Sequence, residues 1–583
     1  MQKQKLELMW VGKEKRAKLE PRILIEDPEK SYHADKRVSD NDIFDNMLIH
    51  GDNLLALKAL EQDYAGRVKC IYIDPPYNTG NAFEHYDDGL EHSIWLSLMR
   101  ERLELLRNLL RKDGFICVHI DDSEGAYLKV LLDEVFGRDN YLTTIYIQVR
   151  YPSKTLKQDM VFHKEIEQIH VYRKEYGAIP VLDKKKNSFD KFNFYIKEKS
   201  QGKEIILGKK KTIIFQPKEY EIIKGIASEN GLKEIWASGT ILDGNSSGRF
   251  FRDFISGRYK EDGLGVLYKV YGIGDDKFSF RYFTGPKKEG ATKGKYYQGV
   301  PLTQLDSDAE DSTVPIENFF DMAGSFGNCR LEGYADFRGG KKPEVLLEKV
   351  LYHFSNPGDL VLDSFLGSGT TAAVAHKMGR RWIGIELGEH CDTHCVPRLK
   401  KVIDGEDAGG ITKSANWRGG GGFRYYNLAP SLVKFDEWGN PVINKDFNEN
   451  MLVRALCKVE GFNFDPSPDV YWKQGKSTES DFIYVTTQHL TAQMLQKLSD
   501  DVGESCTLLI CCGSFDGKKD SYGNLTIKKI PKAILKKCEW NHDDYSLEIK
   551  NLPMSAPDPQ PSPAPRKKSF KKLPPDSNQL DLF

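Results

Sequence analysis

The strongest constraint on the fold is an alternation of short apolar runs with helical stretches that lapses in the middle of the chain. Its first part has strand-like runs at 47–50, 68–73 and 115–120 and helical stretches at 53–62 and 93–111. It resumes at Lys342, with helices at 343–354 and 370–378 and strands at 360–363 and 382–386. Strands that alternate with helices predict a parallel α/β sheet.

The lapse predicts a separate domain inserted into the α/β domain. Between 175 and 330 the chain is rich in Lys, Gly, Ser and aromatic residues, with turn signals such as Asp243-Gly244-Asn245. The last residues are rich in Pro, Ser and Lys, which predicts disorder. We expect an N-terminal arm at 1–45, the two halves of the α/β domain at 46–174 and 331–428, the inserted domain at 175–330, a C-terminal α/β domain at 429–554 and a disordered tail at 555–583.

Composition argues against a membrane or secreted protein. We find no apolar run of the roughly 18 residues that a membrane span needs. The first residues are charged and lack the apolar centre of a signal peptide. The ten cysteines form no Cys-x-x-Cys pair, which is typical of reduced thiols. We therefore expect a cytoplasmic protein.

Positive charge is concentrated in one stretch of a chain whose net charge is −1. Residues 184–218 contain eleven lysines and three acidic residues, with Phe189, Phe192, Phe194 and Tyr195 among them. Such a stretch is either a solvated charged face or a surface that contacts nucleic acid.

The first motif that carries chemistry is Asp74-Pro75-Pro76-Tyr77, which follows the apolar run 68–73. Ligands of open α/β sheets bind at the carboxyl ends of the strands. An aspartate oxygen and a proline carbonyl offer two acceptors for an amino group, and Tyr77 offers a flat face for a base. By itself the motif is also compatible with a strand that ends in a proline-rich turn.

The second motif is a glycine loop, Asp363-Ser-Phe365-Leu-Gly367-Ser-Gly369-Thr370-Thr371. It joins the strand 360–363 to a helix whose amino end Thr370 or Thr371 can cap. Glu386 ends the next strand, where an acid can bind ribose hydroxyls. A dinucleotide would suit the spacing too, but Ala372 stands where a third glycine would be expected.

Together the two motifs resemble the β-class amino methyltransferases, whose target-recognition domain lies where this chain has its insert. The resemblance implies S-adenosylmethionine (SAM) as cofactor and a Rossmann-like, seven-stranded sheet that is circularly permuted. The DPPY form implies adenine N6 rather than cytosine N4 as target. Carried over by motif, the target base is held by Asp74, Pro75, Pro76 and Tyr77, and the cofactor by Asp52, Asp363, Phe365, Gly367, Gly369, Thr370 and Glu386. Asp52 alone would also suit a helix cap.

The length of the chain and several short sequence motifs resemble those of one subfamily, the Mod subunits of type III restriction–modification systems. The short motifs lie at 118–124, 246–249, 282–286 and 341–344. The resemblance implies base flipping in double-stranded DNA, a homodimer and a Res helicase–nuclease partner. The chain has no Walker A lysine loop, so restriction would belong to another chain.

The tail ends in Gln579-Leu580-Asp581-Leu582-Phe583, which resembles the bacterial sliding-clamp binding motif. Apolar anchors at the end of a tether suit a pocket on a partner.

Two further groups have both a structural and a functional interpretation. Asp121 and Glu124 follow a strand and are expected to be structural rather than catalytic. Cys391, His394 and Cys395 suggest zinc, but no fourth ligand is apparent and the segment reads as a helix, so no metal is expected.

Three alternatives to a restriction–modification enzyme remain open. The first is a stand-alone adenine methyltransferase. The second is a DNA-reading module that directs a nuclease, and the third is a cytosine-N4 or RNA methyltransferase. A nicotinamide-dependent oxidoreductase is more distant, because no hydride-transfer residues are apparent.

Overall fold

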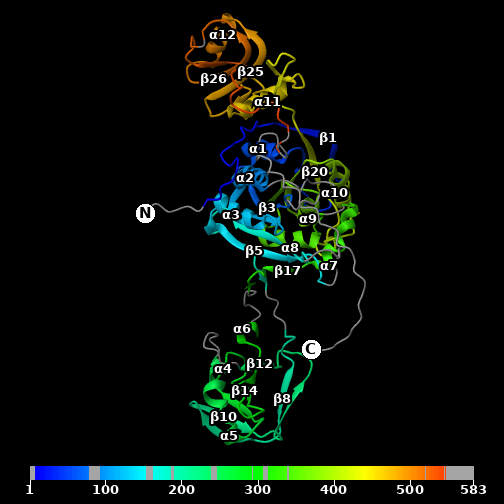
Figure 1. Ribbon diagram of the computed structural model, residues 1–583, viewed down its shortest axis with the longest axis vertical. Coiled ribbons are helices and arrows are strands. Elements are labelled where there is room, and N and C mark those ends of the chain that lie inside the picture. Colours follow the sequence, from blue (N-terminus) through cyan, green and yellow to red (C-terminus); the bar gives the residue numbers. More distant parts are fainter. Residues whose placement is uncertain are drawn as a thin grey trace, which may run out of the picture. The chain divides into compact units, whose positions relative to one another are not determined.

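The computed structural model describes residues 7–77, 92–152, 162–184, 189–237, 246–291, 293–305, 313–337, 340–518, 520–543 and 545. The chain divides into two compact units (Figure 1). Unit 1 comprises Met1–Val181 and Glu317–Phe583, and unit 2 comprises Leu182–Ile316.

A ten-stranded mixed sheet forms the centre of unit 1. Parallel pairing joins β2, β19, β18, β3 and β4, whereas β6 is antiparallel to both β4 and β5. The sheet has more strands than the seven that the resemblance implies. In spatial order it contains β1 (Leu24–His33), β20 (Gly422–Leu428), β2 (Asn46–His50), β19 (Arg381–Glu386), β18 (Leu360–Asp363), β3 (Val68–Ile73), β4 (Leu110–Ile120), β6 (Ile166–Arg173), β5 (Tyr141–Gln148) and β17 (Phe319–Asp321).

Helices cover both faces of this sheet, which explains why every residue of β3 is buried and all of them except Lys69 are apolar. Ile71 and Ile73 point into the core formed with α1 (Asn53–Tyr64), α2 (His92–Leu109) and α3 (Gly125–Phe136). Cys70 and Tyr72 point into the opposite core, formed with α8 (Glu344–Phe354), α9 (Thr370–Lys377) and α10 (Val396–Asp404).

The amino-terminal segment differs from the expected arm, because it contains the edge strand β1. Leu24 to Asp27 pair antiparallel with β20, and the pairing resumes at Tyr32 after an irregularity. The strand is largely half-exposed, so it lacks the apolar run that marks the buried strands. This is why its sequence reads as polar chain.

Unit 2 is built on an antiparallel sheet to which the lysine-rich stretch contributes directly. The stretch supplies β8 (Phe194–Glu198), β9 and β10, and Ile214 and Phe215 of β10 are buried in the unit's two cores. A two-stranded pair joins β8 to β11 (Tyr220–Lys224). The six strands of the main sheet are, in order, β12 (Lys233–Ala237), β15 (Gly294–Gln298), β14 (Phe280–Thr284), β13 (Leu267–Tyr271), β10 (Lys210–Phe215) and β9 (Lys203–Leu207).

The carboxyl-terminal part of unit 1 has a five-stranded sheet with its own cores. The neighbouring Cys511 and Cys512 are both buried in β26, as expected for core residues. Its elements are α11 (Glu449–Glu460), β23 (Asn463–Phe464), β24 (Gly475–Lys476), β25 (Asp481–Leu490), α12 (Ala492–Val502), β26 (Thr507–Phe515) and β27 (Leu525–Lys529). Among the described residues, no helix is both long and apolar enough to cross a bilayer. The tail with Gln579–Phe583 lies outside the described residues.

Candidate active site

The DPPY motif lies at the carboxyl end of β3, where a buried strand delivers it to the edge of the sheet. Pro76 is tied to the helix behind it, because its carbonyl accepts a hydrogen bond of 2.7 Å from Nε1 of Trp95 in α2. The Pro76 carbonyl thus already has a partner within the chain.

Asp74 is held by two groups of this chain. Its Oδ1 accepts from the Tyr77 hydroxyl at 2.8 Å, and its Oδ2 lies 2.7 Å from Lys342 Nζ. The same Tyr77 hydroxyl lies 3.1 Å from Glu167 Oε2, and Glu167 also lies 2.8 Å from His119 Nε2. We call Asp74, Tyr77, His119, Glu167 and Lys342 the Asp74–Glu167 cluster.

Mutual compensation of charge stabilises this cluster. Burial would raise the pKa of Glu167, but Lys342 and His119 outweigh burial and lower it to about 2. Burial would likewise lower the pKa of Lys342, yet Asp74 and Glu167 hold it above its ordinary value. Lys342 is only 6% exposed. Two carboxylates and one ammonium therefore share a site from which water is largely excluded.

The glycine loop is fixed by hydrogen bonds to acids at the ends of two adjacent strands. Asp363 at the end of β18 accepts from Phe365 N at 2.9 Å and from the Thr371 hydroxyl at 2.6 Å. Glu386 at the end of β19 accepts from Gly367 N at 2.6 Å. Gly367 has φ of 57°, a conformation that a side chain would strain.

The expected threonine cap of α9 is wrong. The N-cap is Gly369, with φ of 80°, and no side chain caps it. Thr371 donates instead to Asp363, and the Thr370 hydroxyl contacts Arg398. Both hydroxyls are thus used to hold the loop.

Asp363 is a buried acid with an unusual protonation equilibrium. Burial is the chief cause that raises its pKa to about 7, and the nearby Asp74 and Glu386 add to it. The bonds from Thr371 and Phe365 offset part of the rise. The neutral form of Asp363 is therefore populated at far higher pH than that of an ordinary aspartate, and a nearby positive charge would favour the ionised form.

The two motifs face one cavity. Asp74 lines it from the DPPY side, and Asp363, Phe365, Gly367 and Thr370 line it from the glycine loop. The remaining lining residues are Tyr72, Phe337, Gly340, Lys341, Lys342, Leu347, Leu366, Ser368 and Thr371. Segments far apart in the sequence thus meet across a single pocket.

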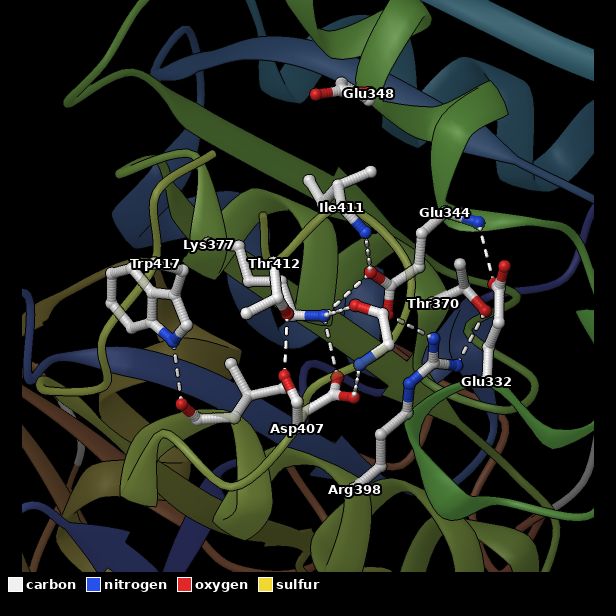
Figure 2. A network of polar contacts seen from close by, with 12 residues as sticks. Glu332, Glu344, Glu348, Thr370, Lys377, Arg398, Asp407, Ile411, Thr412 and Trp417 are labelled. Atoms are coloured by element: carbon white, nitrogen blue, oxygen red, sulfur yellow. Dashed lines mark hydrogen bonds and ion pairs between the residues drawn. The ribbon is translucent and has the colours of Figure 1, made fainter. Parts of the chain in front are cut away.

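A buried charge network supports the glycine loop from behind (Figure 2). Arg398 of α10 donates to the Thr370 hydroxyl at 2.8 Å and pairs at 2.8 Å with Glu344, the first residue of α8. Lys377, the last residue of α9, lies 2.7 Å from both Glu344 and Asp407. Both acids and both bases have fully buried side chains, so charges balance without solvent. Arg398 also donates to the Ser368 carbonyl, at 3.2 Å.

Some residues expected at the site do not line the cavity. Asp52 is the N-cap of α1, accepting from Leu55 N at 3.0 Å, and lies 3.5 Å from Arg102. Its expected contact with a cofactor stays a prediction. Glu386 is bonded to loop backbone, and Tyr77, whose hydroxyl donates to Asp74, is outside the lining. Pro75, Pro76 and Gly369 are also outside the lining.

Three residues of the cluster have no assigned role in the sequence analysis: Lys342, Glu167 and His119. Lys342 and His119 lie in the short motifs 341–344 and 118–124, which resemble those of the Mod subunits. The sequence therefore marks their segments but does not predict their contacts with Asp74 and Glu167. Glu167 lies in an ordinary antiparallel strand, β6, and nothing in its sequence marks it.

The other candidate residues are used structurally. Asp121 accepts from Ser123 N at 2.9 Å and, with Glu124, is absent from the cavity lining. Cys391 and Cys395 are buried in a π-helix, and the Cys395 thiol contacts the Gly367 carbonyl at 3.1 Å. No group of three or more potential metal ligands occurs in the described part of the chain.

The sequence matches the DNA methylase family over residues 68–393, more than half of the chain. The chain belongs to this family. The matched segment begins at β3 and ends in the π-helix behind the glycine loop, so both walls of the cavity belong to the DNA methylase match.

Individual relatives of this DNA methylase include both type III and type II proteins. The probable type III restriction-modification enzyme HindVI Mod subunit of Haemophilus influenzae is 36% identical, over 68% of this chain and 55% of that protein. The type II methyltransferase M.EcaI of Enterobacter cloacae is 31% identical, over 59% and 67%. The type III StyLTI Mod subunit of Salmonella typhimurium is 27% identical, over 60% and 52%. The chain thus spans about half to two thirds of the length of these relatives.

Proposed function

We propose that this DNA methylase transfers a methyl group from SAM to the N6 of adenine in double-stranded DNA. The observation that carries the proposal is the single cavity lined by Asp74 of the DPPY motif and Phe365 of the glycine loop. Asp74, an acceptor for an amino group, lies on one wall, and a glycine loop before a helix lies on the other.

The residues of the glycine-loop wall fit SAM. Asp363 brings a carboxyl group to the cavity, which suits a ligand with a positively charged sulfonium. Phe365 adds an apolar ring, and Gly367 lets backbone approach a ligand closely. We infer that Asp363, Phe365, Gly367 and Thr370 hold the cofactor, with Glu386 fixing the loop. When bound, SAM supplies a methyl group on an activated leaving group.

The DPPY wall positions the nucleophile. The lone pair of adenine N6 is delocalised into the ring, so two acceptors on its hydrogens, Asp74 and the Pro75 carbonyl, favour a more nucleophilic geometry. As the nitrogen forms its new bond it gives up one proton, which Asp74 can receive or pass to water. Holding nitrogen and methyl carbon in line is worth about 7–11 kcal/mol of barrier.

Tyr77 is the residue we assign to the flipped base. Its hydroxyl is fixed by Asp74 and Glu167, so the orientation of its ring is set before a base arrives. Stacking on such a ring offsets part of the few kcal/mol that extrusion from the duplex costs.

We infer that the sheet is a circularly permuted methyltransferase sheet. The support is the position of β18 and β19: they follow β3 in the chain but lie between β2 and β3 in the sheet. The set that we assign to the shared core is β2, β19, β18, β3, β4, β6 and β5, with β1, β20 and β17 as additions.

Recognition of double-stranded DNA is assigned to unit 2, because it carries the lysine-rich strands. The Mod relatives support a role as the modification subunit of a type III system. We further propose a Res helicase–nuclease and a second copy of this chain as partners. The sliding clamp is a further proposed partner, through Gln579–Phe583. A stand-alone adenine methyltransferase is the alternative, in line with the type II relative.

The product identifies the function. The chain is expressed without partner proteins in a host that lacks DNA methylation, and its DNA is digested to nucleosides. We expect N6-methyldeoxyadenosine at one recurrent sequence. Unmodified DNA would contradict the proposal and favour a DNA-reading module. N4-methyldeoxycytidine or methylated RNA would show that the target is cytosine or RNA and not adenine in DNA.

A further inference from the structure

The carboxylate assigned to the target amino group already has a cationic partner within the chain. Lys342 Nζ lies 2.7 Å from Asp74 Oδ2, while Tyr77 occupies Oδ1 at 2.8 Å. Charge-assisted contacts of this length are among the strong hydrogen bonds of proteins. An amino group that donates to Asp74 therefore has to compete with this ammonium.

The structure limits where the ammonium can go. Lys342 is 6% exposed, so moving its charge into water would require opening the wall of the cavity. Leaving it unpaired in a buried site would be costly. Glu167 Oε2 lies 3.8 Å from Lys342 Nζ, within about 1 Å of hydrogen-bonding distance.

Glu167 is suited to receive the ammonium. It is held in place by His119 at 2.8 Å and by the Tyr77 hydroxyl at 3.1 Å. Pro343 stiffens the chain next to Lys342, and α8 begins one residue later, so the backbone is fixed while the side chain swings. The two carboxylates are thus alternative partners of one cation, and Tyr77 bridges them.

We propose that Lys342 is a placeholder cation: it occupies Asp74 until the target amino group binds and then pairs with Glu167. The inference rests on the proposed function and adds a positioning pair to it. The physical reason is charge, because the attacking nitrogen becomes positive as its bond forms. An ammonium still paired with Asp74 would oppose that charge, whereas one neutralised by Glu167 opposes it less.

A pair of variants separates this role from simple support. Glu167→Gln removes the second partner and should trap Lys342 on Asp74. We expect the single-turnover rate of methyl transfer, at saturating SAM, to fall by about tenfold or more. Lys342→Met also loses activity, because Asp74 and Glu167 then lack their cation. The double variant frees Asp74 for the amino group and should be several-fold faster than Glu167→Gln.

Lys341 provides the matched control. It lines the same cavity and is equally buried, but its Nζ donates to the carbonyls of Arg330, Glu332 and Ala335 rather than to a carboxylate. Lys341→Met combined with Glu167→Gln should not be faster than Glu167→Gln alone. If Glu167→Gln weakens the fold, Glu167→Asp repeats the comparison. It retains the negative charge but moves the carboxylate away from Lys342.

The outcomes are distinguishable. A double variant no faster than Glu167→Gln, or a Glu167→Gln rate equal to that of the wild type, overturns the placeholder role alone. Absence of methyl transfer by the wild-type protein contradicts the proposed function and the placeholder role with it. If Lys341→Met speeds up the Glu167→Gln variant as much as Lys342→Met does, the effect comes from the loss of any positive charge near the cavity. That result would also overturn the proposal.

Discussion

Asp74 accepts a hydrogen bond from Tyr77 and balances the charge of Lys342. A neutral side chain could do the first but not the second. Asp74→Ala should lower methyl transfer by about 100-fold or more, the scale seen when a positioned polar group is removed from a reaction centre. SAM binding should stay within a few-fold of wild type, because the glycine loop holds the cofactor. Tritiated-methyl incorporation and calorimetric SAM binding measure the two effects.

Asp74→Asn is the informative companion to that variant. It keeps the size of the side chain and one acceptor oxygen, but places an amide donor near Lys342. We expect it to be as impaired as Asp74→Ala. Incorporation near the wild-type rate in either variant would contradict the acceptor role.

Asp363 should make stability depend on pH in the direction opposite to a paired carboxylate. Its pKa is about 7 in the folded protein against 3.8 ordinarily, so the folded protein keeps a proton that the unfolded chain releases between these values. The free energy of unfolding therefore falls as pH rises through this window, by up to about 4 kcal/mol, and is level above about pH 7. Urea unfolding of wild type and Asp363→Asn from pH 4 to 8 measures the difference. A difference that does not change with pH would refute the assignment.

At the scale of secondary-structure elements, the buried network couples the first residue of α8, the last of α9 and the first turn of α10 to the glycine loop. Arg398→Met leaves one uncompensated buried negative charge and should cost about 3–5 kcal/mol of unfolding free energy. SAM affinity should fall as well, because Thr370 and the Ser368 carbonyl lose the hydrogen bonds that Arg398 donates. Removing Glu344 too, as Arg398→Met with Glu344→Gln, rebalances the charge.

The double variant distinguishes support of the fold from positioning of the loop. It should recover part of the stability lost in Arg398→Met, while SAM affinity stays low because the guanidinium is still missing. Lys434→Met removes the exposed pair with Asp446 and should change stability by less than about 1 kcal/mol. Full recovery of SAM affinity in the double variant would reduce the network to a structural element.

Secondary-structure elements with a mostly apolar sequence are predictable. Elements whose formation depends on pairing with a distant segment, such as the edge strand β1, are not. The strand 68–73 and the strand 360–363 coincide with β3 and β18, because burial on both faces makes such strands mostly apolar. Strand β1 is missed because one side faces solvent. Likewise the resemblance of the two motifs to a family predicts one site for Asp74 and Phe365, whereas Glu167 comes near Asp74 only through antiparallel pairing of β6 with β4.

At the scale of the whole molecule, DNA recognition is assigned to unit 2, and the structure decides how that is tested. Deleting residues 184–218 would remove β8, β9 and β10, with Ile214 and Phe215 from the cores, so loss of binding would report unfolding. Exposed lysines can be changed without touching those cores. Lys197, Lys203 and Lys209 meet this condition.

Changing these three lysines to Gln should weaken DNA binding most at low salt, because a protein that neutralises fewer phosphates releases fewer counterions. The slope of log affinity against log salt should become shallower by about 0.9 for each lysine that binds a phosphate, and thus by up to about 2.7. The control changes three exposed lysines of the carboxyl-terminal part, Lys445, Lys497 and Lys536. An unchanged slope in the first variant with a shallower slope in the control would assign the duplex to the carboxyl-terminal part instead, because counterion release follows the lysines that lie against phosphate.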